Sequence, residues 1–224
     1  MGTGLVASVD RVKKVTISVI FGSVRISVDK GLGFANHQEW AAWCRGNQRI
    51  AERSVFAFAD MHDLVYGIDH SAQQGNITAF WALAAGQLKL VAESLSQSGS
   101  ISSPVLQPIC LTAELAMKGT LLQLGVPEQD LKNSKLFGHN LAKLGQKIVE
   151  ERSHRDDKLL LSALSKFPDY VGDRYRETNL SRLEVISLAL DAQFVLASAV
   201  RRMSGEDMAH QFETTKPGPR ANFF

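Results

Sequence analysis

One histidine of this chain stands at a place where side-chain chemistry is feasible. His139 follows Gly138 in the stretch LFGHNLAKL, residues 136 to 144, and precedes Asn140, a residue type that often caps a helix. An imidazole there could serve as a catalytic base, as a ligand, or as a packing group that hydrogen-bonds a buried acid. We favour the packing role, because buried polar clusters more often fix the register of helices than perform reactions.

The expected partners of His139 come from other parts of the sequence. Glu114 precedes Lys118 by four residues, in the order that favours an ion pair on a helix. Arg174 and Tyr175 follow later and could close the same cluster. A nucleotide or RNA phosphate could then meet Lys118 and Arg174, because cationic donors hydrogen-bond phosphate strongly. The candidate ligand-binding residues are Glu114, Lys118, His139, Asn140, Arg174 and Tyr175.

A second group of polar residues lies in DMHDLVYGIDH, residues 60 to 70. A metal site would need His62, Asp63 and His70 to converge, but their spacing differs from the helical pair that HExxH proteins use. We interpret the segment as a solvated helix end and loop. No metal and no cofactor is therefore predicted.

Composition limits the kind of protein this chain can be. Its 224 residues, 45% of them hydrophobic, are enough for one sizeable core. A formal charge of +2 gives no whole-molecule attraction to polyanions, so any contact with nucleic acid must be local. Cys44 and Cys110 have no partner at metal or disulfide-framework spacing, which fits a reducing cytoplasm. The most apolar stretch, VISLALDAQFVLASAV, carries Asp191 and Gln193 and is too short to span a bilayer, so we predict a soluble cytoplasmic protein without a membrane contact.

The elements that must position these residues are mainly helices. The predicted helices run from Asn36 to Asp63, from Asn76 to Leu95, from Ser103 to Leu124, from Leu141 to Ile148, from Asp157 to Phe167 and from Ser181 to Arg202. Apolar residues recur at helical spacing in these segments, and Trp40, Trp43, Ile50, Phe58 and Trp81 are core candidates. The last helix has a capping box at its start and apolar side chains on two faces, so we expect it at the centre.

One segment near the N-terminus alternates like a strand. In VTISVIFGSVRISV, Val15 to Val28, a two-residue turn at Gly22-Ser23 would make one face of a β-hairpin apolar and the other largely polar. A hairpin alone is marginally stable in water, so it must lie on helices or on a second copy of the chain.

Three segments of the predicted bundle resemble the HEPN superfamily of small helical domains. They are LTAELAMKGTLLQLG (residues 111 to 125, after the helix FWALAAGQLKLVAESL), GHNLAKL (138 to 144) and PDYVGDRYRE (168 to 177), which runs into the last helix. Family members often have an ELALKALL-type helix, a GHDL-type helix start and an RYP-like element in this order. The chain departs from that pattern at Asn140, where many relatives have an acid, and at Arg176, where proline would follow Arg-Tyr.

The resemblance implies two kinds of function. Many HEPN proteins are metal-independent ribonucleases that use an Arg followed a few residues later by a His, whereas others lack the pair and bind nucleotides or proteins, sometimes a nucleotidyltransferase. No arginine of this chain precedes a histidine at that spacing. Lys135 stands four residues before His139, but a lysine lacks the guanidinium fork and the spacing also differs. We therefore expect a non-catalytic module that binds a nucleotide, an RNA phosphate or a protein partner, in a toxin-antitoxin or defence setting. The alternatives are a ribonuclease with an unusual site on His139 and Arg174, and a structural oligomerisation module with the hairpin as its adhesive edge.

The predicted organisation has four parts. Residues 1 to 35 contain the hairpin, residues 36 to 75 an accessory helix and loop, residues 76 to 204 the HEPN-like bundle, and residues 205 to 224 a flexible polar tail. We expect the protein to form a homodimer through apolar helix faces.

Overall fold

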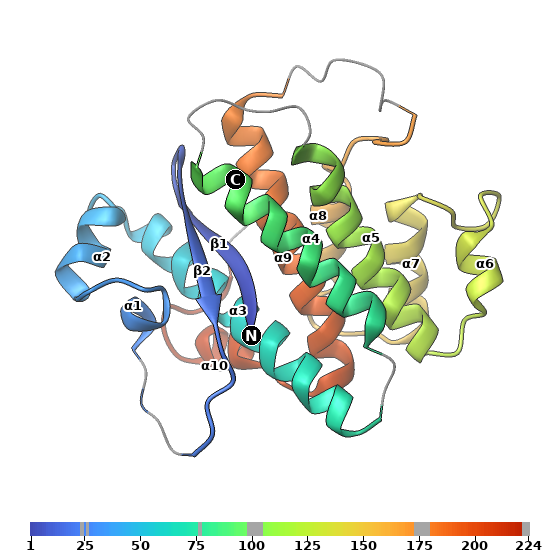
Figure 1. The fold of residues 1–224 in the computed structure, drawn as a ribbon, viewed down its shortest axis with the longest axis horizontal. Coiled ribbons are helices and arrows are strands. Elements are labelled where there is room, and N and C mark those ends of the chain that lie inside the picture. Colours follow the sequence, from blue (N-terminus) through green and yellow to red (C-terminus); the bar gives the residue numbers. More distant parts are fainter. Residues whose placement is uncertain (23–24, 26, 76–77, 98–104, 173–179, 221–224) are drawn as a thin grey trace.

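The computed structural model is mainly helical, with an antiparallel β-hairpin at the N-terminus, as predicted (Figure 1). It describes residues 1–22, 25, 27–75, 78–97, 105–172 and 180–220. The elements in chain order are β1 (Gly2–Ser8), β2 (Arg11–Ile17), α1 (Val28–Gly31), α2 (His37–Trp43), α3 (Gln48–Gln73), α4 (Ala79–Gln97), α5 (Leu106–Gln123), α6 (Glu128–Lys132), α7 (Leu141–Glu151), α8 (Asp157–Leu164), α9 (Arg182–Ser204) and α10 (Met208–Thr214). The predicted caps Asn76 and Ser103 lie outside the described residues.

Helix α9 is the central element of the fold, as its two apolar faces predict. It packs against α3, α4, α5 and α8, which surround it (Figure 1). By length and composition α9 is the one helix among the described residues that could cross a membrane, but 89% of its apolar window is buried inside the protein. Its apolar surface therefore forms the core of the bundle.

The ends of α9 follow from local hydrogen bonding. The Ser181 side chain accepts from the backbone N–H of Glu184, and the Glu184 carboxylate accepts from the backbone N–H of Ser181 at 2.7 Å, which is the predicted capping box. At the other end Gly205 closes the helix. The predicted apolar stripes of α4 and α5 are also buried, and Trp81 is 0% exposed, with its indole N–H donating to the Ala116 carbonyl.

The hairpin lies earlier in the chain than predicted. Gly2 pairs with Ile17 and Ser8 with Arg11, so the turn falls at Val9 and Asp10. The predicted pairing within Val15–Val28 is wrong, because the chain leaves the sheet after Ile17 and Val28 begins α1. Ser23, half of the predicted turn, lies outside the described residues.

The glycines of β1 explain why this strand was missed. In a strand pattern they weaken the prediction, but they also permit close approach of another element. A Cβ atom at Gly4 would overlap the side chains of Met61 and Gln193, and one at Gly2 would overlap Val65. The two glycines therefore let β1 lie directly on α3 and α9.

A side chain of α9 completes the hydrogen bonding of β1. Gln193, 1% exposed, accepts from the Leu5 backbone N–H at 2.8 Å and donates to the Leu5 carbonyl at 3.2 Å. The side-chain amide thus pairs with the N–H and carbonyl of Leu5 on the edge of β1 that faces away from β2. In a larger sheet a third strand would make these hydrogen bonds. Leu5 and Ala7 of the hairpin are thereby part of the main core of the bundle.

The predicted helix from Asn36 to Asp63 is two helices. Arg45 and Gly46 have φ angles of 55° and 65° between α2 and α3, and the left-handed backbone at Gly46 ends the first helix. The core candidates Ile50 and Phe58 are buried, whereas Trp40 and Trp43 are half-buried. Both tryptophans pack against a small second core formed by Val6, Val15, Leu32, Phe34, Ala57 and Phe58.

The C-terminal segment is structured over most of its length, so the predicted flexible tail is wrong for residues 205 to 220. Helix α10 packs on α3, and Ala209 is fully buried. The Arg220 guanidinium donates to the Asp60 carboxylate at 2.6 and 2.8 Å. Ion pairs hold this segment on α3, and ion pairs do not produce the periodic apolar pattern from which helices are predicted.

Candidate functional site

Helix α5 and the start of α7 bring Glu114 and His139 together. Glu114 is 3% exposed, and its two carboxylate oxygens lie 3.1 and 3.0 Å from His139 Nδ1. A carboxylate only accepts hydrogen bonds, so Nδ1 carries the proton. The other ring nitrogen, Nε2, is thereby left to face away from the acid as the reactive position.

Two more side chains converge on the same carboxylate. Lys118, one turn along α5, donates to Glu114 at 2.8 Å, and the Tyr170 hydroxyl also donates to it. Burial raises the pKa of Glu114, but the hydrogen bonds from Lys118, Tyr170 and His139 lower it by a larger amount. The net pKa therefore lies below its ordinary value. Glu114 is therefore an ionised acid held by three donors. We call Glu114, Lys118, His139 and Tyr170 the His139 site.

The imidazole of this site is open to solvent on one side. The His139 side chain is 56% exposed, whereas those of Glu114 and Lys118 are 4% and 10% exposed. Within the described part of the chain, Nε2 of His139 has no hydrogen-bond partner. The predicted contact with a buried acid is present, but the ring is not sealed in the core. Its exposed nitrogen accepts a proton in the neutral ring and donates a hydrogen bond to an anion only in the doubly protonated ring.

The predicted site residues are placed unevenly. Glu114, Lys118 and His139 meet, whereas the Asn140 side chain caps α7 by accepting from the Lys143 backbone N–H at 2.9 Å. Arg174 and Tyr175 lie outside the described residues, so their predicted part in the cluster stays a prediction.

Tyr170 is the member of the site that the sequence analysis missed. It comes from the same PDYVGDRYRE stretch as Tyr175, and its backbone N–H closes a turn on the Pro168 carbonyl. Its side chain is 8% exposed, and burial together with the Glu114 carboxylate raises its pKa well above the ordinary value. Tyr170 is therefore a neutral donor. The sequence signal for Tyr170 was its position two residues after Pro168, in a turn. Spacing alone does not show which of the two tyrosines, Tyr170 or Tyr175, reaches Glu114.

Cys110, one turn before Glu114 on α5, is fully buried. Burial and the nearby Glu114 carboxylate raise its pKa to about 12. Because only the thiolate is a good nucleophile, Cys110 serves as a packing group.

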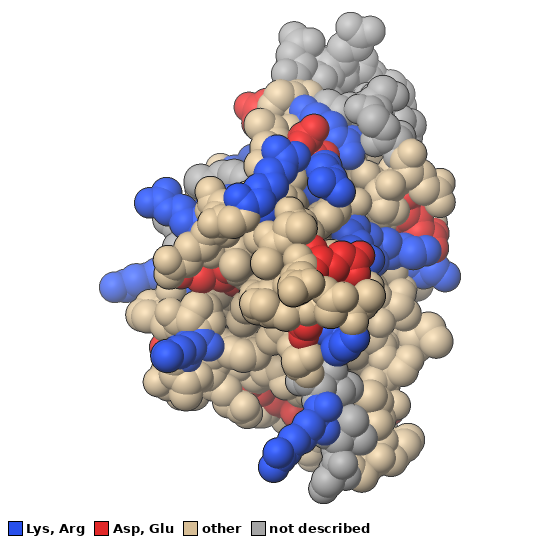
Figure 2. Space-filling view, turned by 90° about the vertical axis from the view of Figure 1, so that its left-hand side faces the viewer, with Lys and Arg blue, Asp and Glu red and all other residues tan. Residues whose placement is uncertain are grey.

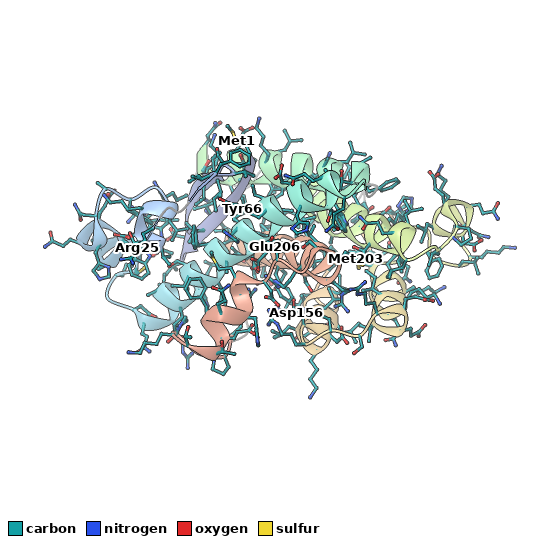
Figure 3. The ribbon with its side chains drawn as sticks, turned by 90° about the horizontal axis from the view of Figure 1, so that it is seen from below. Met1, Arg25, Tyr66, Asp156, Met203 and Glu206 are labelled. Atoms are coloured by element: carbon teal, nitrogen blue, oxygen red, sulfur yellow. The ribbon has the colours of Figure 1, made fainter. Side chains whose placement is uncertain are left out.

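A second cluster of charged side chains joins α3, α8, α9 and α10. The Arg201 side chain, 1% exposed, donates to Asp63 at 2.8 Å, to Asp156 at 2.7 Å and to Asp60 at 2.9 Å. Arg155 pairs with Asp207 and Glu213 of the C-terminal segment. Figure 3 shows Asp156 and Glu206 on this side of the molecule, where the end of α9 meets the C-terminal segment. We call Asp60, Asp63, Asp156, Asp207, Arg155, Arg201 and Arg220 the arginine–aspartate cluster.

This cluster corrects the interpretation of DMHDLVYGIDH as a solvated helix end. Asp63 is 0% exposed and accepts from Arg201 and from the backbone N–H groups of Met208 and Ala209, the start of α10. His62 contacts Asp63 at 3.2 Å, whereas His70 contacts Glu206 at 3.3 Å. No group of three metal-ligating side chains able to hold an ion occurs in the searched, described ranges. The segment lies within helix α3, and two of its acids, Asp60 and Asp63, bind the C-terminal segment.

Comparisons with family models, with curated proteins and with solved structures give no match. The fold and the site therefore define the class of protein by themselves. It is a mainly helical bundle with an N-terminal hairpin and a carboxylate-oriented imidazole at its surface.

Proposed function

We propose that this chain is a non-catalytic HEPN-like module that binds a nucleotide or an RNA phosphate at the His139 site. One observation carries the proposal. The three segments behind the resemblance lie far apart in sequence, yet each contributes a side chain to one contact group: Glu114, His139 and Tyr170. Such convergence is what a family-wide site on this bundle requires.

The chemistry of the site supports an anionic ligand. Lys118 has three N–H donors, of which Glu114 takes one. The outward-facing Nε2 of His139 joins them as a donor only when the ring carries a second proton. Donors of this kind bind phosphate oxygens through charge-assisted hydrogen bonds. Arg174, as predicted from the sequence, would add a guanidinium from the segment that follows Tyr170.

A thermal-shift screen with mono- and dinucleotides tests the proposal. A nucleotide present at one hundred times its Kd stabilises the folded protein by about 2.7 kcal/mol. His139→Ala should remove this shift. Because the variant also loses one of the three donors to Glu114, its shift is measured from its own unliganded melting temperature. His210→Ala, an exposed histidine on α10, is the matched control and should keep the shift. An equal shift in the wild type and in His139→Ala contradicts the assignment of the site, and silence across the panel contradicts nucleotide binding and favours a protein partner.

A second candidate function is a metal-independent ribonuclease built on His139 and Arg174. The observation that favours it is the Glu114–His139 hydrogen bond, because a general base needs one ring nitrogen held so that the other can take a proton. Incubation of the protein with RNA in EDTA decides between the two functions. Cleavage that is lost in His139→Ala and retained in His210→Ala establishes the enzyme, and intact RNA at high protein concentration excludes it.

We also propose that the module is a soluble, cytoplasmic homodimer. What supports the dimer is the outer face of α4, where Leu83 and Leu90 are 57% and 54% exposed, two turns apart on the same side. A nucleotidyltransferase remains a proposed protein partner, on the strength of the resemblance alone.

A further inference from the structure

The positive charge of the chain is concentrated at its N-terminal end. Residues 1 to 53 contain eight Lys and Arg against four Asp and Glu, whereas the rest contains 17 against 19. These residues form the hairpin, α1, α2 and the first turn of α3, which share one side of the molecule. Figure 2 shows Lys and Arg side chains spread over that side, with Asp and Glu between them. A local attraction for polyanions is therefore available there, although the whole chain is nearly neutral.

Strand β2 presents two of these cations on one face. Alternate residues of a strand point to the same side, so Arg11 and Lys13 lie on the side where Val15 enters the small second core. The Arg11 guanidinium lies 4.7 Å from the centre of the Trp43 ring, and the Lys13 ammonium lies 4.9 Å from that of Phe34. Cation–π contacts thus hold both side chains over aromatic rings.

Neither of these two cations pairs with a carboxylate in the described parts of the chain. In contrast, the adjacent Lys14 pairs with Glu93 at 3.5 Å. Arg45 reaches the same edge, where it lies 3.4 Å from Asp10 and its side chain remains 48% exposed. Cations that are already ordered lose less conformational entropy when they bind an anion.

We propose that Arg11, Lys13 and Arg45 form a docking surface for the phosphate backbone of single-stranded nucleic acid. Arg11 and Lys13 are two strand residues apart, about 7 Å, a distance that successive phosphates of one extended strand can match. A base can stack on the outer face of the Arg11 guanidinium. The aromatic rings lie beneath the cations, with Phe34 4% exposed, so they anchor the cations and do not project as a wedge into a lipid bilayer. This surface shares no residue with the His139 site and does not depend on the function proposed for that site.

Charge reversal tests the surface. Binding of a fluorescent oligouridylate is followed by anisotropy, for the wild type and for Arg11→Glu/Lys13→Glu. Lys132→Glu/Lys158→Glu is the matched control, since it makes the same change in net charge on α6 and α8. We expect the first pair to weaken binding at least about tenfold at 50 mM salt, and the slope of log K against log salt to fall by about 1.4, the value for two lost single-strand contacts. The control should change affinity less than about twofold. Circular dichroism spectra establish that both double variants are folded.

Each other outcome overturns the proposal. If the folded wild type does not bind oligouridylate, the proposal is wrong. It is also wrong if both double variants weaken the affinity for oligouridylate equally, because that result would reflect net charge alone. Binding to phosphatidylserine vesicles without binding to the oligonucleotide would assign the surface to membranes. The two sites are separated by repeating the Arg11→Glu/Lys13→Glu comparison in a His139→Ala background, where the weakening of at least about tenfold should persist whether or not the His139 site also binds RNA.

Discussion

At the scale of single residues, charges buried in the interior decide more of this structure than the sequence pattern indicates. Arg201 lies in the last turn of α9, where a cation can complement the helix dipole, but its guanidinium is enclosed by aspartates from α3, from the start of α8 and from the segment before α10. Burial lowers the pKa of a guanidinium, but these acids outweigh it and raise the pKa of Arg201 well above its usual value. Arg201 is therefore ionised throughout the physiological range.

Asp156 gives the test of this cluster. Burial raises its pKa, but the charges of Arg201 and Arg155 lower it by a larger amount. The net pKa of Asp156 therefore lies far below the ordinary value. Asp156→Asn leaves Arg201 without one anion, and removal of one partner of a buried ion pair costs about 3–5 kcal/mol. We expect a loss of this size in the free energy of unfolding by urea at pH 7.

The pH dependence follows from the sign of the shift. A carboxyl group whose pKa is lower in the folded state stabilises the fold above its unfolded pKa, about 3.9, and loses this contribution as the pH falls through the folded value. The difference between the wild type and Asp156→Asn should therefore shrink as the pH falls below about 4. Asp69→Asn, at a more exposed acid on α3, should change stability by no more than about 0.5 kcal/mol. A constant difference between wild type and Asp156→Asn across this pH range would contradict the account.

A contact between two side chains was predictable where both lie in segments that carry a recognisable sequence motif. The contact between His139 and Glu114 was anticipated from a helix start and an acidic helix position. The contact of Tyr170 with Glu114 was not anticipated, because the sequence does not distinguish two tyrosines that lie in the same turn-rich stretch. Of the two, Tyr170 lies within the described residues and Tyr175 does not.

At the scale of elements, helices with strong local signals were predicted closely. The capping box of α9 and the Asn140 cap of α7 fix those starts through contacts within four residues. The hairpin was misplaced because its pairing depends on what lies beneath it. An alternating pattern continued past Ile17, but the glycines at positions 2 and 4 allowed β1 to fit the surface of α3 and α9. Such a fit depends on contacts distant in sequence.

The role of Gln193 can be tested at this scale. Gln193→Leu keeps the volume of the side chain but leaves the buried N–H and carbonyl of Leu5 unpaired, at about 1–3 kcal/mol for each unsatisfied group. The free energy of unfolding by urea should fall accordingly. Gln146→Leu, on the exposed side of α7, is the control and should stay within about 0.5 kcal/mol of the wild type. Equal stability of Gln193→Leu and wild type would show that the strand edge finds other partners.

At the scale of the whole molecule, the four predicted parts do not form separate cores. The hairpin contributes Leu5 and Ala7 to the main core and Val6 and Val15 to the second. The C-terminal segment closes over α3 through the arginine–aspartate cluster. The mainly helical class was predictable from composition and periodicity. The way the two ends of the chain pack on α3 was not predictable, because neither the close fit at Gly2 and Gly4 nor ion pairs between distant segments leave a period in the sequence.

The proposed dimer is tested at this scale by light scattering. Leu83→Glu/Leu90→Glu places two carboxylates on the outer face of α4, where burial in an interface would be costly. We expect the wild type to have twice the mass of this double variant. Leu183→Glu, at an exposed leucine of α9, should keep the mass of the wild type. A monomeric wild type at high protein concentration would contradict the dimer.

The bond between Leu5 and Gln193 joins positions 188 residues apart. During synthesis on the ribosome, the first strand therefore emerges long before the helix that completes its hydrogen bonding. Contacts of such long range form late, because the intervening chain must first be closed into a loop. The amino-terminal hairpin should consequently reach its final state only after α9 has been synthesised and has packed on it.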